Sequence, residues 1–202
     1  MAKNLLLAVL VLASLGWYSC TKSTDNSDGP GTPYKLSYGD SILYMKASGT
    51  NIVSPTVHRE GRYSGFPEGI EIDEVTGAIN VANSETGLRY RITHVSPAGD
   101  ITTTLVVLSG ITFRDHFYNL ATGDSIALPV YNSDDRRVLP LDGSTFDEGN
   151  VANGGGCAVK TDNGKINLKE TIRNGVFGSP PRNDAQETFE IKYRVNDASG
   201  KS

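Results

Sequence analysis

The chain is poor in the residues that build metal sites, disulfide scaffolds and sugar-stacking platforms. Its 202 residues include one Trp, two Cys and three His. Two cysteines are too few for a disulfide-dense scaffold. The histidines, in "VHRE", "THVS" and "RDHF", are scattered with no pair at a ligand spacing, so no zinc site is expected. The single Trp17 lies in the N-terminal apolar segment, which leaves the rest of the chain without Trp for stacking on a sugar.

Long apolar runs, helical periodicity and basic charge are also scarce. Leu5–Gly16 is an apolar run of twelve residues, shorter than the roughly 20 residues of a membrane-spanning helix. No stretch after residue 20 keeps a helical period for three turns. The formal net charge is −4. Nucleic acids and anionic lipid headgroups are therefore poor partners, because both need a basic surface.

The N-terminus has the features of an export signal that ends at a cysteine. Lys3 precedes the apolar run, and the residues after it, "WYSC", contain no small-x-small cleavage site. The Ser19–Cys20 step resembles the lipobox of bacterial lipoproteins, from which it departs at Trp17. This resemblance implies a signal peptide over residues 1–19 and a lipid anchor, with acyl chains such as palmitate, on Cys20. The alternative is an unusual signal that leaves Cys20 free or paired in a disulfide.

The polar segment that follows Cys20 also resembles that of a known group. Residues 20–33 predict a flexible tether, and "TKSTDNSDG" is similar to the Lys-then-acidic tethers of Bacteroidetes-type lipoproteins. That similarity implies attachment to the bacterial outer membrane, with display on the outer face of the cell. Removal of residues 1–19 leaves 18 basic and 23 acidic side chains and a net charge of −5, because Lys3 is the only charged residue removed.

The rest of the chain has the pattern of short strands separated by turns. Runs such as "GAINVAN", "LRYRITHV" and "ITTTLVVLS" alternate with the period of two that half-buried strands show. Glycine is abundant, with 22 residues, and turn-forming pairs recur along the chain. The predicted fold class is all-β.

Three echoes in the same order indicate an internal repeat. "YGDSILYM" at 38–45 recurs as "TGDSIALPV" at 122–130, and "EVTGAINV" at 74–81 recurs as "TDNGKINL" at 161–168. "RYRITHVSPAGD" at 89–100 is echoed by "KYRVNDASGK" at 192–201. The repeat predicts two tandem β-sandwich modules over residues 34–110 and 111–202, divided near Ser109–Gly110.

Residues 66–108 of the first module contain, in this order, Pro67, Gly69, Ile70, Ile72, Asp73, Thr76, Gly77 and Ile79. This pattern resembles the immunoglobulin-like, cadherin-like domains of bacterial surface proteins. It implies that both modules are immunoglobulin-like sandwiches. Gly77 is expected to take a positive φ, and the Asp73 carboxylate to cap the turn. The second module keeps Gly164 and Ile166 but lacks the Pro-Gly pair.

The end of the second module lacks a counterpart of the strand "ITTTLVVLS" that closes the first. The matching turn reads "NDASGKS" and the sequence stops. A sandwich without its last strand exposes unpaired backbone groups of a neighbouring strand. Two explanations stay open: the sequence is a fragment, or the missing strand is supplied by another chain.

The candidate reactive residues have simpler explanations. "GDSI" resembles the nucleophile block of Gly-Asp-Ser-Leu esterases, but the late Asp-x-x-His of that family is missing and the block occurs twice, as a turn into a strand does. The same residues resemble the Asp-Ser/Thr-apolar acceptor of Bacteroidetes O-glycosylation, which would place sugars on Ser41 and Ser125. Cys157 is expected to be a small buried hydrophobe. No catalytic residue, metal ligand or cofactor site is predicted.

The expected function is that of a non-enzymatic cell-envelope lipoprotein that acts as a spacer, adhesion or protein-interaction module. Its partners would be the membrane, through the lipid, and a cell-surface protein or glycan. The alternatives are a glycan-binding accessory lipoprotein of a polysaccharide-uptake system, and the N-terminal stalk of a longer surface enzyme. Tyr34, Tyr38, Tyr44 and Phe117–Tyr118 are the rings that a glycan site would use, although core or rim positions are the simpler expectation.

Overall fold

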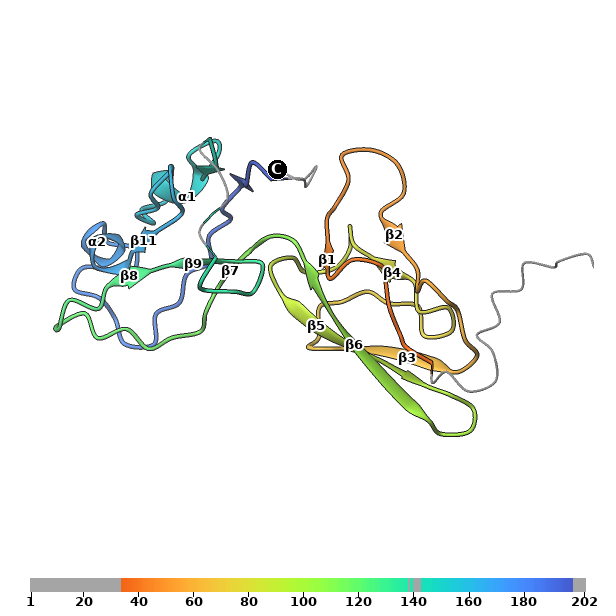
Figure 1. Ribbon diagram of the computed structural model, residues 1–202. Helices are drawn as coiled ribbons and strands as arrows, with labels where there is room; N and C mark the ends of the chain where they lie inside the picture. Colours follow the sequence, from red (N-terminus) through yellow and green to blue (C-terminus); the bar gives the residue numbers. More distant parts are fainter. Residues whose placement is uncertain (1–33, 138, 140–142, 198–202) are drawn as a thin grey trace, which may run out of the picture. The chain divides into compact units, whose positions relative to one another are not determined.

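The computed structural model describes residues 34–137, 139 and 143–197 (Figure 1). The predicted signal peptide, the anchor Cys20 and the tether over 20–33 lie outside the described residues, as do residues 198–202 of the "NDASGKS" turn. Within the described part of the chain, no helix has the length and hydropathy that crossing a membrane requires.

The described chain is built mostly of short strands in several small sheets, so the prediction of an all-β fold is confirmed. The strands of the first half are β1 (Ile42–Leu43), β2 (Ile52–Val53), β3 (Arg62–Phe66), β4 (Ile79–Asn80), β5 (Arg89–Val95) and β6 (Ile101–Leu108). Those of the second half are β7 (Ile111–Phe113), β8 (Ile126–Ala127), β9 (Pro129–Tyr131), β10 (Thr145–Phe146), β11 (Ile166–Asn167) and β12 (Tyr193–Arg194). The helices are α1 (Val151–Gly154) and α2 (Leu168–Arg173), neither longer than two turns.

The largest sheet has the strand order β1-β6-β5-β3 (Figure 1). Strands β3, β5 and β6 are antiparallel and pair without a bulge, with Tyr63 opposite His94 and His94 opposite Thr102. The short strand β1 is parallel to β6 and pairs with it at Val107 and Leu108. In β5 the sequence alternates clearly, and alternation directs every second side chain to the core.

One face of this sheet covers the core of the first half of the chain. Its buried side chains come from strands β1, β3, β4, β5 and β6 and from the segments next to β1 and β4: Leu36, Tyr38, Leu43, Tyr63, Ile79, Val81, Tyr90, Ile92, Val106 and Leu108. The polar tips of the buried tyrosines find backbone acceptors, as buried hydroxyls require. The Tyr38 hydroxyl donates to the Gly77 carbonyl at 2.6 Å and the Tyr90 hydroxyl to the Glu85 carbonyl at 2.9 Å.

The second half has smaller sheets and a smaller core. Strand β7 pairs with β9, β8 with β11, and β10 with β12. The buried cluster consists of Phe146, Ala152, Cys157 and Val159, with half-buried side chains packed around it. Cys157 is buried and free, as the sequence suggested, and burial raises the pKa of its thiol. The thiol is therefore a packing group in the second core.

The second repeat echo folds into the same turn in both halves. The Gly77 and Gly164 φ angles are +72° and +70°, and each glycine N–H donates at 2.8 Å to the carbonyl four residues earlier, of Asp73 or Lys160. In each turn a backbone carbonyl also accepts a 2.9 Å hydrogen bond from the N–H of an aromatic residue in a neighbouring strand. The Tyr63 N–H donates to the Glu74 carbonyl, and the Phe146 N–H donates to the Thr161 carbonyl. The sequence repeat therefore corresponds to a repeated local structure.

The first turn behaves as the sequence predicts. The Asp73 carboxylate accepts hydrogen bonds from the backbone N–H groups of Val75 and Thr76 and from the Thr76 hydroxyl. The bond from the Thr76 N–H contributes most to lowering the pKa of Asp73, followed by the Thr76 hydroxyl and the Val75 N–H. The predicted cap and the positive φ of Gly77 are both confirmed.

The glycine-rich composition of residues 149–156 favours a flexible loop, but the structure shows an ordered segment. It forms α1 around the buried carboxylate of Asp147, which accepts from the N–H groups of Ala152 and Asn153, each at 2.8 Å, and from the Asn153 side chain at 2.7 Å. Burial by itself would raise the pKa of Asp147. The hydrogen bonds that its carboxylate accepts outweigh the effect of burial, so the pKa lies below its ordinary value. The composition of residues 149–156 does not indicate that the Asp147 carboxylate would order them.

The expected division near Ser109–Gly110 is a segment held by hydrogen bonds. The Ser109 hydroxyl and the Tyr131 hydroxyl donate to the same oxygen of Asp197, at 2.9 and 2.6 Å. The Gly110 N–H donates to the Asn132 side chain at 3.0 Å, and the Ile111 N–H to the Tyr193 hydroxyl at 3.2 Å. Burial, and then the bond to Asp197, raise the pKa of Tyr131 to about 12. This connection is therefore ordered by residues from 131–132 and 193–197.

Candidate functional site

The solvent face of β3, β5 and β6 is the most regular exposed surface that the structure describes. We call it the sheet face and define it by its outward residues: Arg62, Ser64 and Phe66 of β3; Arg89, Arg91, Thr93 and Val95 of β5; and Ile101, Thr103 and Leu105 of β6. The strand register arranges them in rows across the sheet. Residues of one row are cross-strand neighbours and lie close enough to contact one ligand together.

One row combines an aromatic ring, a cation and an aliphatic side chain. Phe66 is opposite Arg91, and Arg91 is opposite Leu105. The Arg91 guanidinium lies 5.7 Å from the centre of the Phe66 ring, within the range of a cation–π contact. Phe66 is 63% exposed and Leu105 is 56% exposed. Both side chains therefore offer apolar area that a partner would remove from water on binding.

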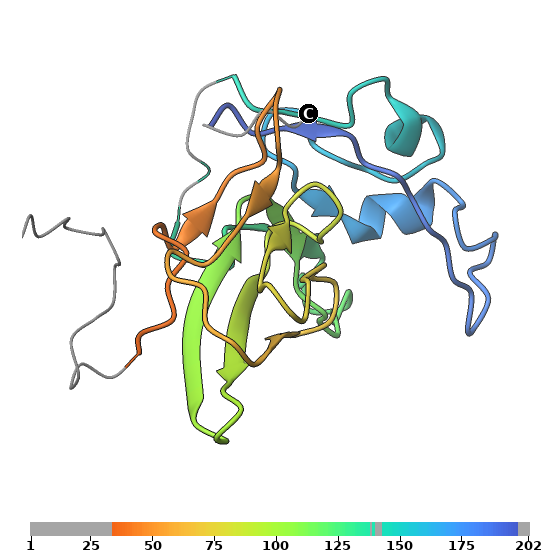
Figure 2. The same ribbon diagram turned by 90° about the vertical axis from the view of Figure 1, so that its right-hand side faces the viewer.

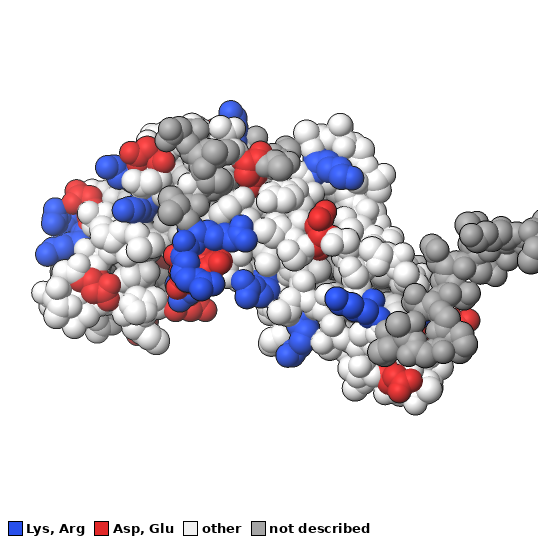
Figure 3. Space-filling model, viewed as in Figure 1, with Lys and Arg blue, Asp and Glu red and all other residues white. Residues whose placement is uncertain are grey.

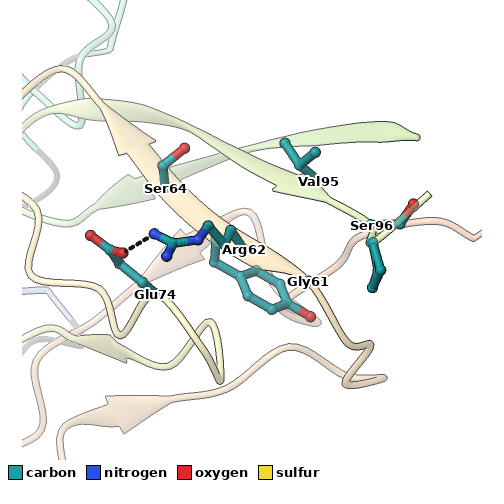
Figure 4. A pocket seen from close by; sticks show the side chains of 8 residues that line it. Gly61, Arg62, Ser64, Glu74, Val95 and Ser96 are labelled. Atoms are coloured by element: carbon teal, nitrogen blue, oxygen red, sulfur yellow. Dashed lines mark hydrogen bonds and ion pairs between the residues drawn. The ribbon is translucent and has the colours of Figure 1, made fainter. Parts of the chain in front are cut away.

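The next row is polar, and the one beyond it borders a pocket. Ser64 is opposite Thr93, which is opposite Thr103, so hydroxyl groups cross the middle of the face. At the far end, Arg62, Ser64 and Val95 line an open pocket of about 580 Å³ (Figure 4). Its other lining residues are Gly61, Tyr63, Glu74, Ser96 and Pro97.

An ion pair crosses this pocket. Figure 4 shows the Arg62 guanidinium turned toward Glu74, to which it is bonded at 3.0 Å. Both side chains are largely exposed, so the pair contributes little to stability and is available to an incoming polar group. The lining residues supply hydroxyls, one acid and one base, which suits binding by hydrogen bonds.

Charge over the surface is mixed. Figure 3 shows Lys and Arg interspersed with Asp and Glu over the face that it presents. The acidic pair Asp134–Asp135 forms ion pairs with arginines: Asp134 with Arg136 and Arg137, and Asp135 with Arg114. In residues 34–137, 139 and 143–197 no group of three His, Cys, Asp or Glu side chains is arranged to hold a metal ion.

The tyrosines singled out in the sequence do not form an exposed platform. Tyr38 is buried, and Tyr34 is half-buried, with its hydroxyl bonded to the Val57 carbonyl at 3.1 Å and its ring against His94. The interpretation of these two rings as core and rim residues is confirmed. The ring of Phe117 is fully exposed, and Tyr118 makes an edge contact with His116 at 4.6 Å between ring centres.

The two Asp-Ser-Ile segments occupy similar positions. Gly39 and Gly123 have φ angles of +84° and +88°, and the Ser41 and Ser125 carbonyls accept backbone bonds at 2.8 Å from Val107 and Leu168. Ser41 is exposed and Ser125 half-buried. Both segments are thus turns that lead into a strand, β1 or β8.

The histidine nearest to an Asp-Ser-Ile segment binds its aspartate. His116 lies 3.4 Å from Asp124, and both side chains are about half exposed. Within the described residues, the hydrogen bonds of the other two histidines go to carbonyl groups, of Val75 for His58 and of Glu60 for His94. The structure gives no serine–histidine hydrogen bond among the residues that it describes.

The comparisons with known proteins leave the class open. No family model, no curated protein and no solved structure matches this chain. The functional argument therefore depends on the chain's own residues.

The sequence analysis did not identify the sheet face. The information was present in part, since Arg62, Ser64 and Phe66, and likewise Ile101, Thr103 and Leu105, alternate with buried or half-buried positions. What was missing was the register, which alone determines that Phe66, Arg91 and Leu105 become neighbours. The predicted sites Ser41 and Ser125 do not belong to this face, and Cys20 lies outside the described residues.

Proposed function

We propose that this chain is a non-enzymatic lipoprotein of the bacterial cell envelope, in which two immunoglobulin-like modules act as a spacer that presents a binding face. The apolar run that ends at Cys20, followed by a polar tether, supports anchoring of the chain to the outer membrane by a lipid. The repeated turns at Gly77 and Gly164 support two modules of one kind.

The row formed by Phe66, Arg91 and Leu105 is the observation that carries the binding role. An exposed ring with a cation above it offers both dispersion and electrostatic contacts, and neither needs a reactive group. Since the modules place this row on a regular sheet, the surface is formed before a partner arrives. A surface of this kind suits a protein partner at the cell surface.

The proposal separates into two experiments. For the anchor, Cys20→Ser should shift the protein from the membrane fraction to the aqueous fraction of its own cells. For the binding face, capture of a surface protein should be lost in Phe66→Ser and kept in Phe117→Ser. Both variants remove an exposed ring, but only Phe66 lies on the sheet face. Equal capture by the two variants would contradict the proposed face.

A glycan-binding role is the second candidate, and the exposed ring of Phe117 favours it. A fully exposed aromatic ring is able to stack on the apolar face of a sugar. Retention on immobilised polysaccharide that is lost in Phe117→Ser and kept in Phe66→Ser would support this role in place of protein binding.

A further inference from the structure

Over most of its length, one backbone edge of strand β6 is free of any strand that the structure describes. Along one side it pairs with β5 from Ile101 to Val107. Along the other side its only partner among the described strands is β1, at Val107 and Leu108. The β5–β6 hairpin extends well beyond β1 (Figure 2).

Alternation of the backbone groups identifies which residues use this edge. The Val107 N–H donates to Ser41 beside β1, whereas the Leu108 N–H donates to Leu88 on the β5 side. In a strand the direction reverses at each residue. The N–H and C=O groups of Ile101, Thr103 and Leu105 therefore point away from β5, toward the free edge.

The edge lacks the features that usually block strand pairing. Segment Ile101–Leu108 contains no charged residue and no proline, and its pairing with β5 has no bulge. The opposite edge strand of the sheet, β3, carries Arg62, ends before Pro67 and has its outer side bonded at Tyr63 to Glu74. Charges, prolines and bulges are the means by which exposed edges avoid association, so an unprotected edge is a template for another strand.

We infer that β6 pairs with β6 of a second copy of this chain, antiparallel about a two-fold axis at Thr103. In this register Thr103 meets Thr103 of the second copy, and Ile101 meets Leu105. All three residues that point to the edge then exchange backbone hydrogen bonds with the second copy. Registers centred one residue away leave one of the three without a partner on the free edge, because β1 already covers Val107.

The side chains of the edge fit a second copy as well as the backbone does. Ile101 and Leu105 are 69% and 56% exposed, and the proposed register packs each against the other across the axis. Threonine faces threonine at the centre, which is a favourable cross-strand pair. No like charges meet, since the strand has none, and an isologous contact of this kind closes on itself as a dimer.

This dimer would join two sheet faces into one surface. The row of Phe66, Arg91 and Leu105 continues into Ile101 of the second copy, and the hydroxyl row continues through Thr103. The inference thus deepens the proposed binding role by naming a partner, but it does not depend on the lipid. The experiments below use the full chain with Cys20→Ser, so their failure and that of the anchor are distinguishable.

The first experiment is sedimentation equilibrium, over about 10–500 µM chain in a mild non-ionic detergent. We expect a monomer–dimer equilibrium that Thr103→Lys weakens about tenfold or more, because two lysines meet at the axis. Ser64→Lys adds the same charge to the same face on the opposite edge strand, β3, and should leave the equilibrium unchanged. A monomer at every concentration, or an equal response of the two variants, would overturn the inference.

The second experiment tests the register by disulfide formation in air. Opposed residues of a hydrogen-bonded pair have Cα atoms about 5.5 Å apart, which suits a disulfide. Thr103→Cys should therefore link to itself. Ile101→Cys alone should form no disulfide, because the two copies of residue 101 lie four positions, or roughly 13 Å, apart in this register, and the same holds for Leu105→Cys. When the two variants are mixed, residue 101 of one copy should form a disulfide with residue 105 of the other. Self-linking of Ile101→Cys, or none by Thr103→Cys, would contradict the register even if Thr103→Lys failed to fold.

Discussion

Two left-handed glycines that lie against a buried ring, one in each half, predict a pair of matched effects on stability. At Gly77 and Gly164 a Cβ atom would lie 2.6 Å from the ring of Tyr63 or of Phe146, with φ near +70° in both cases. Gly49 and Gly123 have φ near +88° and nothing within 4 Å of such an atom. Alanine at these four positions therefore separates backbone strain from steric contact.

The magnitudes follow from these distances. A left-handed residue with a Cβ costs about 1 kcal/mol, partly offset by the lower entropy of the unfolded chain. Forcing a methyl group against a packed ring adds about 1–3 kcal/mol. We expect Gly77→Ala and Gly164→Ala to lower the free energy of unfolding by about 2–4 kcal/mol, and Gly49→Ala and Gly123→Ala by about 1 kcal/mol or less.

Urea unfolding followed by far-ultraviolet circular dichroism measures these differences. If the halves are separate modules, Gly77→Ala should shift one transition and Gly164→Ala the other. The reasoning would be refuted if Gly77→Ala cost no more than Gly49→Ala, because the contact with Tyr63 would then have no energetic consequence.

Further predictions concern the buried carboxylate, the connecting segment and acid stability. Asp147→Ala should lower the free energy of unfolding by about 3 kcal/mol, because it leaves the N–H groups of Ala152 and Asn153 without their acceptor. Thermal melting would detect this loss, and a change below about 1 kcal/mol would contradict the role assigned to Asp147. Tyr131→Phe should cost about 1–2 kcal/mol in urea titration, because Asp197 loses a donor. The folded-state pKa values of Asp73 and Asp147 are lowered, so their contributions are present above the unfolded pKa of about 4 and disappear as pH falls through the folded values. Asp147→Asn should therefore lose less stability between about pH 4 and pH 2 than the native chain, as measured by urea midpoints; an equal loss would refute this.

The sequence predicted those local features of the fold whose geometry depends only on residues close together in the chain. The turn at Asp73–Gly77 is of this kind, because its cap and its positive φ involve neighbouring residues. Strand β5 is also of this kind, since its alternation of polar and apolar residues indicates which side chains turn inward.

Features that depend on strand pairing or on a distant acceptor could not be predicted. The order β1-β6-β5-β3 places Phe66 beside Arg91 although they belong to separate runs, and alternation does not report register. In segment 149–156, glycines favoured a loop, while the Asp147 carboxylate that organises α1 lies outside the segment.

Intact mass of the protein, isolated with detergent from its own cells, tests the central claim most directly. The account predicts a chain that begins at Cys20 and carries the added mass of acyl groups. A product that lacks acyl groups would contradict the lipoprotein assignment and with it the proposed place of the protein at the outer membrane.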